Sequence, residues 1–525
     1  MTVVLGDYKS PGVTTQAVPG PQIGVFSNAP TAVGIFGDTR RSNIYTENIT
    51  VPWDSIESDE DTGGEGGTEP TDPGEPSDSP EEEEIPDPEE VDGTGEPAGG
   101  TSEATTTITP NPHLLVKAGV DLETIKVVDP ITGTEFQKDV DYTTKYVDPL
   151  ATNAVGTVTR TLDGALEENL PVRITYNYVT DSYFEARSFY DFDDVRDAFG
   201  PAFDKNGKII SELTLAAQFA FVNGASHVVL SPLQVEGTSE ATLDDYVKAL
   251  NKLANVPSIS VVCSASGDPK VFSSVKQHVV NQSNNASERR AILGLDGTKE
   301  AYSTGDRLVK AGELSQQRVA LVSPSRFGYF ESQTNDVVEI GSQFIACGIA
   351  GYSVSQSPSQ PLTRKNIEGI STFPEEEVDQ VKTQESAGGL MVVERTRRGT
   401  VRIRHGVTTN PSTLLTREWS IIGQEDAMAI RMRNLLDDDG IIGSPIDDTT
   451  LINVKASADT ALQSLVRDEV IRDYQELKVR QTPEQPDVIE IRYEWRASVP
   501  LNYIVVRYSI NMSTGELLDS GSETV

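Results

Sequence analysis

Cysteine and histidine are scarce in this 525-residue sequence. Its two cysteines, Cys263 and Cys347, lie far apart in separate apolar runs, so they suggest neither a disulfide framework nor a cysteine-based zinc site. Such a composition is typical of a protein made in a reducing cytoplasm. The four histidines, at positions 113, 227, 278 and 405, show no HExxH-like spacing. We therefore expect no cofactor and no metal site of these types.

Long apolar runs are also absent. No stretch approaches the roughly 18 apolar residues of a membrane helix. The opening residues MTVVLGDYKSPG contain no basic segment followed by a long apolar one. We expect a soluble chain with no export signal and no membrane insertion.

Lysine and arginine are missing from residues 54–103, which hold 20 Asp and Glu. Without these carboxylates the net charge falls from −38 to −18. A mixture of Pro, Gly, Ser and Glu buries too little apolar surface to offset the entropy of ordering it. The sequence therefore predicts a disordered acidic loop over residues 54–108. Because nucleic-acid-binding surfaces are basic, we expect no direct contact with nucleic acid.

Phosphate-binding and catalytic motifs are absent as well. The segments CSASGDP, GLDGT and SPSRF follow expected strands, and none contains GxGxxG or GxxxxGK[ST]. Ser264, Ser266 and Asp268 could be pictured as a nucleophile and its helpers, but there is no GxSxG elbow and no suitably placed histidine. Small polar residues after a strand are commonly helix caps. We expect caps here and no enzymatic activity.

Residues 437–448, DDDGIIGSPIDD, bring five aspartates together. Gly440 falls at the wrong place for an EF-hand loop, and the bidentate Glu is missing. The pattern predicts a helix end and an acidic turn, with a weak calcium site as the alternative.

The first part of the chain reads as extended and β-rich. Residues 1–22 contain Pro11, Pro19 and Pro21, which indicates an arm that cannot pack by itself. Residues 23–53 are strand-like and are expected to pack with the core or the C-terminal domain. After the acidic loop, residues 109–180 predict a β-rich insertion, in which Val172, Ile174, Tyr176 and Tyr178 alternate most clearly.

Residues 181–390 alternate between strands and helices. Ser211 caps an expected helix that ends at Gly224, and Thr242 precedes a second. Further helices are expected near 269–284 and 304–313, separated by the apolar strands SHVVLSPL, SISVVCS, RAILGLDG and RVALVSP. This alternation favours right-handed crossovers, a mostly parallel sheet covered on both faces, and hence a central α/β domain.

Residues 391–507 predict an α+β domain. A hairpin is expected around Arg398 and Gly399, then a helix at about 424–437, and finally two strands broken at Pro500. A second helix is expected over residues 456–478, where six apolar residues keep helical spacing: Leu462, Leu465, Val466, Val470, Tyr474 and Leu477. The polar residues 508–525 form a second arm. The whole chain is thus expected to be a multidomain α+β and α/β protein.

Arginines are concentrated in one part of this acidic chain. Between residues 395 and 433 there are eight, at positions 395, 397, 398, 402, 404, 417, 431 and 433. A cationic cluster of this kind is a candidate docking patch for an acidic protein partner. Internal pairing with the protein's own carboxylates explains the cluster equally well.

Four stretches resemble the tail sheath proteins of contractile bacteriophages. YKSPGVTTQAV at 8–18 is similar to the Pro-Gly-Val opening of that family, and AVGIFGDTRR at 32–41 to the strand and turn that follow. FGPAFDKNGKIISELTLAAQFAFVNGASHVVL at 199–230 and PLNYIVVRYSI at 500–510 resemble its central and closing segments. The resemblance lies in the order of these motifs, and it does not cover 54–180, a variable insertion in the family.

The resemblance implies a structural subunit. Sheath subunits form a helical homo-oligomer of stacked hexameric rings around a tube, and the sheath contracts to drive the tube through the host envelope for genome ejection. The implied partners are further copies of the chain, the tail tube protein, and baseplate and tail terminator proteins. The implied location is the virion tail, after assembly in the host bacterial cytoplasm, with the insertion facing outward.

The resemblance also implies roles for particular residues. The terminal arms would add strands to the C-terminal domains of neighbouring subunits, a form of β-augmentation. Arm candidates are Val3, Val4, Leu5, Pro11, Gly12, Val13, Ile510, Leu517 and Leu518. The C-terminal domain would face the tube, with Arg404, Arg431, Arg433 and Lys455 as contact candidates.

Three alternatives stay open at this point. The first is the sheath of a related contractile injection particle, such as a bacteriocin. The second is a surface-array protein or adhesin, which would need an export signal. The third is a hydrolase built on residues 199–325, which would need a recognisable base and nucleophile.

Overall fold

The computed structural model describes residues 31–39, 43–49, 54–56, 108–110, 112–148, 154–167, 169–178, 181–235, 240–374, 376–438 and 440–508. The expected N-terminal arm, most of the acidic loop and nearly all of the C-terminal arm therefore lie outside the described residues. The chain folds as two compact units. One comprises Met1–Asn43 and Thr180–Val525, and the other is Ile44–Val179.

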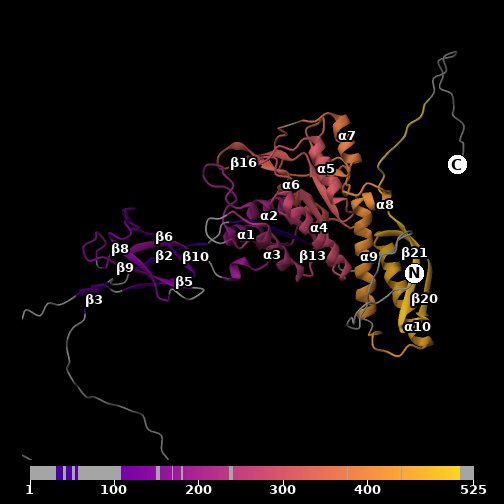
Figure 1. The fold of residues 1–525 in the computed structure, drawn as a ribbon, viewed down its shortest axis with the longest axis horizontal. Helices are drawn as coiled ribbons and strands as arrows, with labels where there is room; N and C mark the ends of the chain where they lie inside the picture. Colours follow the sequence, from indigo (N-terminus) through magenta and orange to yellow (C-terminus); the bar gives the residue numbers. More distant parts are fainter. Residues whose placement is uncertain are drawn as a thin grey trace, which may run out of the picture. The chain divides into compact units, whose positions relative to one another are not determined.

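An eight-stranded sheet forms the centre of the first unit (Figure 1). Its order is β11 (Arg187–Phe189), β12 (Val228–Pro232), β1 (Ala32–Gly37), β13 (Ile259–Ser264), β14 (Arg290–Gly294), β15 (Val319–Ser323), β18 (Leu390–Arg395) and β19 (Val401–Ile403). The six middle strands are parallel, and the two edge strands are antiparallel to their neighbours. The expected mostly parallel sheet is confirmed.

Helices cover both faces of this sheet. One face carries α2 (Glu212–Val222) and α6 (Ser342–Ser355), and the other carries α3 (Leu243–Ala254), α4 (Pro269–Asn284), α5 (Thr304–Leu314) and α7 (Asp379–Ala387). Successive residues of β13 show the two faces: Val262 packs in the core with α3, α4 and α5, whereas Cys263 lies 3.8 Å from the carbonyl oxygen of Ala346 on α6. Ser211 and Thr242 cap α2 and α3 as expected, each accepting a backbone N–H.

Shorter elements complete the α/β part. They are the 3₁₀ helix η1 (Asp181–Phe184), α1 (Phe192–Phe199), α8 (Leu414–Arg417), and the hairpin β16 (Arg326–Glu331) with β17 (Asp336–Gly341). The expected boundary at residue 390 falls at the start of β18, which pairs in parallel with β15. The expected hairpin around Arg398 is present as β18 and β19, but it belongs to the central sheet.

The C-terminal elements form a smaller layered core. They are α9 (Trp419–Asp438), α10 (Asp448–Arg467), β20 (Ile471–Thr482) and β21 (Gln485–Ala497). Apolar side chains of α9, α10 and the hairpin form one cluster, which includes Met428, Leu462 and Tyr493. Figure 1 shows α9 and α10 next to the yellow hairpin.

Two expectations for this region are wrong. The helix expected at 456–478 is α10, which ends at Arg467, so that Tyr474 and Leu477 belong to β20. Glu476 has a positive φ of 55° at a bulge where the ladder register shifts, and the shift spaces the inward side chains of the strand irregularly. The second strand expected after Pro500 is also missing, because residues 501–508 form no strand within this chain.

The second unit is β-rich in its described residues. One sheet has the order β2 (Asn43–Ile49), β10 (Val172–Tyr178), β6 (Val120–Val128) and β7 (Glu135–Phe136). The others are β5 (His113–Ala118), β9 (Val155–Arg160) with β8 (Tyr142–Tyr146), and β3 (Asp54–Ile56) with β4 (Ile108–Pro110). Val172, Ile174 and Tyr176 are buried in its core, as their alternation predicts.

The structure revises the edges of this unit. Residues 43–49 were expected to pack with the core, but β2 joins the sheet of the insertion. Residues 54–56 were expected in the disordered loop, but they pair with 108–110, and Ile56 lies opposite Ile108. None of the helices in the described part of the chain is long and apolar enough to span a membrane.

Candidate functional site

The residues considered for catalysis serve as caps and turns. Asp268 caps α4 by accepting the N–H of Lys270, and Ser264 Oγ accepts the N–H of Ser266. Asp447, in the acidic turn, caps α10 by accepting the N–H of Thr450. Within the described ranges, no group of three or more His, Cys, Asp or Glu side chains is arranged to hold a metal ion.

The two cysteines, far apart in sequence, meet in the fold. Cys263 on β13 and Cys347 on α6 are both buried free thiols. Burial raises the pKa of the Cys347 thiol, and the neighbouring Cys263 raises it further. The Cys347 thiol therefore remains protonated, and both cysteines pack as small buried side chains.

Most of the arginine cluster has partners inside the chain. Arg402 and Arg404 both pair with Glu394, at 2.7 and 2.6 Å, and Arg404 also reaches Asp379 at 3.1 Å. Burial acts to raise the pKa of Glu394, but hydrogen bonds from the two guanidinium groups outweigh it and lower the pKa. Arg404 is therefore held by an internal ion pair at the edge of the central sheet.

The other arginines of the cluster differ in how many internal contacts they make. Arg431 pairs with Asp468 at 3.2 Å, and Arg433 makes a buried, two-pronged pair with Glu288. Arg417 lies 3.2 Å from Glu418, and Arg395 contacts the ring of Phe373 and the carbonyl oxygen of Ser371; Arg397 and Arg398, in the β18–β19 turn, are exposed with no partner among the described residues. Lys455, on α10, is exposed. Of the four expected tube contacts, Lys455 is thus the freest and Arg433 the most enclosed.

Buried charges anchor α9 to the central sheet. Asp426 lies between Arg290 at 3.3 Å and Arg318 at 2.5 Å. The guanidinium of Arg290 also stacks over the ring of Trp419, 4.4 Å from its centroid. Burial lowers the pKa of Arg290 to about 10, although Asp426 opposes the shift. These contacts fix the first half of the helix that carries the C-terminal core.

Glu425 lies next to Asp426 in this junction, and it is 9% exposed. Burial raises its pKa to about 7, the charge of Asp426 raises it too, and Arg318 partly offsets both. No ion pair to Glu425 occurs within the described residues. The group therefore titrates in the neutral range.

The C-terminal tail leaves the fold at a fixed point. The side chain of Gln424, on α9, donates to the carbonyl oxygen of Ser498 at 3.0 Å and accepts its N–H at 2.7 Å. Asn502 donates to the buried carboxylate of Glu418 at 3.1 Å. Both anchors hold residues beyond the end of β21, so the tail is attached to the fold at Ser498 and Asn502.

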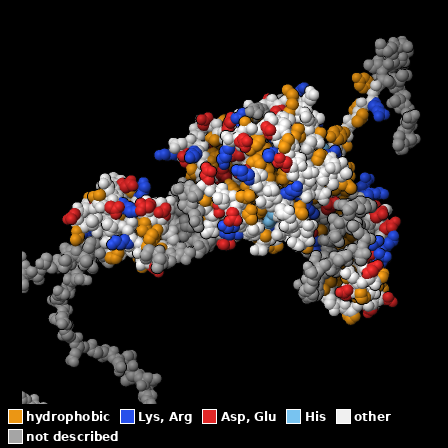
Figure 2. All heavy atoms as spheres, in the orientation of Figure 1, with side chains coloured by type: hydrophobic (Ala, Val, Ile, Leu, Met, Phe, Trp, Pro, Cys, Tyr) orange, Lys and Arg blue, Asp and Glu red, His pale blue; other side chains and the backbone are white. Residues whose placement is uncertain are grey.

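Exposed apolar side chains lie on both sides of the second anchor, Asn502. They are Leu501, Tyr503, Ile504, Val505, Val506 and Tyr508, each 73–80% exposed. Figure 2 shows hydrophobic side chains along this segment. A run of β-branched and aromatic residues has high strand propensity, yet it pairs with no strand in the described part of the chain. An exposed apolar segment of this type marks an interaction site.

The hairpin β20–β21 has open strand edges, with which an exposed strand-forming segment could pair. It is a separate two-stranded sheet, so both outer edges carry backbone groups with no strand partner among the described residues. Charged pairs such as Arg480 with Glu490 cross its exposed face. An open edge of this kind can receive an added strand.

Comparison with known proteins decides the family. A tail sheath protein of Mycobacterium phage Bxz1 is 40% identical over an alignment of 572 residues, which covers 98% of this chain and 98% of that protein. The chain belongs to the tail sheath proteins. As a member of this family, it is a structural subunit of a sheath. No protein-family model matches this sheath protein.

Among solved structures, the sheath protein is similar to the contracted helical sheath of the anti-feeding prophage, with 12% identity, a TM-score of 0.49, and coverage of 63% of this chain and 90% of that chain. It is also similar to a sheath tail protein of Desulfitobacterium hafniense, with 10% identity, a TM-score of 0.41, and coverage of 73% and 79%.

Sequence reasoning missed the anchors of the tail. The arm candidates Val3, Val4, Leu5, Pro11, Gly12, Val13, Ile510, Leu517 and Leu518 lie outside the described residues. The tail of the sheath protein is held by Gln424, on α9, and by Glu418, the residue before α9, and both polar side chains are buried. A Gln among the apolar residues of a helix and a Glu directly before that helix were the available signal, because such groups need partners when buried.

Proposed function

We propose that this subunit polymerises with copies of itself around a tail tube, and that the polymer contracts to drive the tube through the host envelope. The observation that carries the proposal is the anchored, exposed apolar segment 501–508. A lone subunit gains nothing from this segment, whereas a neighbour with an open strand edge can bury it. The subunit would act through its contacts with other subunits, and we infer that it involves no catalysis.

Strand exchange is the proposed connection. The tail of one subunit adds to an open edge of the β20–β21 sheet in a neighbour, as do the residues of the N-terminal arm. Backbone hydrogen bonds join the subunits, while the connectors between arm and core allow the cores to rotate and slide. The segment 501–508 comes before the expected arm at 508–525, so we place the start of the C-terminal arm near Ser498.

The partners follow from this arrangement. Further copies form stacked rings in the tail of a virion assembled in the host cytoplasm, the baseplate and tail terminator proteins meet the ends, and the β-rich unit faces outward. The tube would meet the C-terminal α+β elements through weak charge pairs repeated along the tail, each worth roughly 0 to 1 kcal/mol. Lys455 is the best placed candidate for such a pair, because it is exposed and unpaired among the described residues.

Negative-stain microscopy of the purified protein tests the proposal. We expect long hollow cylinders, and uniform monomers or flat arrays would overturn it. Purified tube protein should co-sediment with the sheath, and Lys455→Glu should weaken that binding most at low salt, where screening is least. Lys270→Glu, at an exposed position on α4, is the matched control for the same charge reversal. Equal tube binding by both variants would remove Lys455 from the interface.

A further inference from the structure

A cavity of about 440 Å³ opens at the carboxyl edge of the central sheet. Its walls come from the residue after β1, the segment before α2, the loop after β14, and the junction of β17 with α6. β12 and β13, which follow β1 in the chain, lie on opposite sides of β1 in the sheet. The order of the strands therefore reverses direction next to β1. In α/β sheets, such a switch point is where ligands bind, outside the carboxyl ends of the strands.

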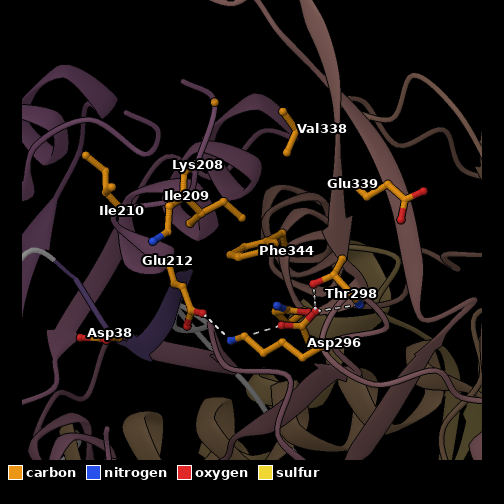
Figure 3. A pocket seen from close by; sticks show the side chains of 14 residues that line it. Asp38, Lys208, Ile209, Ile210, Glu212, Asp296, Thr298, Val338, Glu339 and Phe344 are labelled. Carbon is orange, nitrogen blue, oxygen red and sulfur yellow. Dashed lines mark hydrogen bonds and ion pairs between the residues drawn. The ribbon is translucent and has the colours of Figure 1, made fainter. Parts of the chain in front are cut away.

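Negative charge is in excess in this cavity. Asp38, Glu212, Asp296 and Glu339 line it, together with only two ammonium groups, Lys208 and Lys299. Lys299 Nζ lies 3.0 Å from Glu212 Oε1 and 3.3 Å from Asp296 Oδ2, so one cation serves two carboxylates. Figure 3 shows Glu212 and Asp296 converging on the ammonium group between them.

The pKa of Glu212 is affected by burial and by the excess of carboxylates. Burial raises the pKa of this carboxyl; the ion pair with Lys299 opposes the shift, and the charges of Asp38 and Asp296 add to it. Burial acts to lower the pKa of Lys299, but Glu212 and Asp296 outweigh it and raise the pKa. A second cation near Asp38 would relieve the repulsion among the three carboxylates.

Gln343 gives an independent sign of a missing donor. This residue, on the first turn of α6, is 1% exposed and lines the cavity, yet its Oε1 accepts no hydrogen bond. A Cβ on Gly341 would lie 2.0 Å from this oxygen and 2.8 Å from Asp296 Oδ1, so both acceptors lie against the same glycine. A buried amide oxygen without a donor costs free energy that a ligand N–H can recover.

Apolar side chains complete the cavity. Ile209, Val338 and Phe344 lie across from the carboxylates of Asp38, Glu212 and Asp296, as Figure 3 shows. An apolar wall facing an acidic floor fits a molecule with a methylene chain and a cationic head. A bare metal ion would leave the apolar wall unused, and no suitable group of three ligands occurs in the described residues.

We propose that this cavity binds an alkylammonium or alkylguanidinium group, with its methylenes against Ile209, Val338 and Phe344 and its N–H groups directed at Asp38 and Gln343. Such a group has two sources, a free polyamine or a Lys or Arg side chain of a second copy. The chemistry is the same for both, because each head group presents several N–H donors. The proposal does not depend on sheath assembly.

The test uses the full-length unassembled chain, with agmatine as the probe. At low salt, agmatine should raise the melting temperature saturably, beyond the effect of NaCl or guanidinium chloride at the same ionic strength. Asp38→Asn should weaken agmatine binding at least fivefold by calorimetry, and Gln343→Leu should do the same. Asp38→Asn leaves the Lys299 ion pairs in place, and exposed Asp197→Asn on α1 is the control for one lost carboxylate.

Two results would overturn the proposal. One is the absence of a saturable shift in the wild-type protein. The other is equal binding by Asp38→Asn, Gln343→Leu and Asp197→Asn, since agmatine would then bind elsewhere, such as the acidic residues 54–103. A second arm separates the two sources by sedimentation. If a side chain of another copy fills the cavity, agmatine inhibits polymer formation by the wild-type protein; if free polyamine fills it, polymer formation is unchanged.

Discussion

Asp426 is the residue on which the joint between α9 and the central sheet depends. It accepts a hydrogen bond from Arg318 and forms an ion pair with Arg290, and all three side chains are largely buried. Removing one partner of a buried pair costs about 3–5 kcal/mol, because the other charge is left uncompensated. Glu425, its neighbour, has no such pair in the described residues, so burial of its charge is a cost that Arg318 only partly offsets.

Glu425→Gln should therefore stabilise the protein in a pH-dependent way. Below about pH 4.5 the carboxyl is protonated in both the folded and the unfolded chain, and the variant should match the wild type. Between 4.5 and 7 the unfolded chain loses its proton first, so the wild-type free energy of unfolding falls as pH rises. Above about 7 the full penalty, on the order of 3 kcal/mol, applies to the wild type alone.

Melting temperatures at pH 5 and pH 8 measure this effect. The gain of Glu425→Gln over the wild type should be several times larger at pH 8. Asp426→Asn is the matched control, and it should destabilise at both values because it leaves two buried arginines unpaired. An equal gain at pH 5 and pH 8 would show that the charge of Glu425 is not what burial penalises.

At the scale of elements, the sequence predicted those features that depend on neighbouring residues. The caps at Ser211 and Thr242 and the alternating strands and helices of the central sheet are confirmed. Helix α6 was missed, because it is buried on most sides and shows no amphipathic period. The bulge at Glu476 and the partner of Arg433, 145 residues away, depend on tertiary contacts that spacing does not encode.

The tail is the element whose removal should separate folding from assembly. Truncation after Asn502 keeps the anchor to Glu418 and removes apolar side chains that are at least 73% exposed, so the melting temperature should change little. Assembly into cylinders should be lost, because the exposed apolar strand is the proposed link between subunits. Truncation after Tyr508 keeps the described segment 501–508. Comparing the two truncated chains by electron microscopy shows which part of the arm links one subunit to the next.

A double substitution provides the matched control for length. Ile504→Asp with Val506→Asp keeps every backbone group while placing charge on the strand, and it should also abolish cylinders. Ile504→Thr with Val506→Thr keeps strand propensity and should weaken assembly less. Normal cylinders from the Asp variant would contradict strand addition by this segment.

At the scale of the whole molecule, charge opposes assembly. The chain carries a net charge of −38, half of which lies in residues 57–107. Identical subunits of this charge repel one another when they are brought together, and salt screens that repulsion. The acidic residues keep assembled particles apart if they lie on the outside, but they would disturb packing if they lay between subunits.

Deleting residues 57–107 distinguishes these two positions. Ile56 pairs with Ile108, so the ends of the deleted segment are neighbours on an antiparallel ladder, and an Asn-Gly turn can join them without moving either strand. The deletion reduces the net charge from −38 to −19. It should change the free energy of unfolding by less than about 1 kcal/mol, because loop length changes closure entropy only logarithmically. Cylinders should still form, and light scattering should show them adhering to one another at low salt, where the wild-type particles stay apart. A control that replaces the segment with an uncharged Gly-Ser linker of equal length should adhere in the same way, since charge rather than length is responsible. If the shortened chain failed to assemble while the uncharged linker succeeded, the segment would act as a spacer between parts of the sheath, and its charge would be secondary.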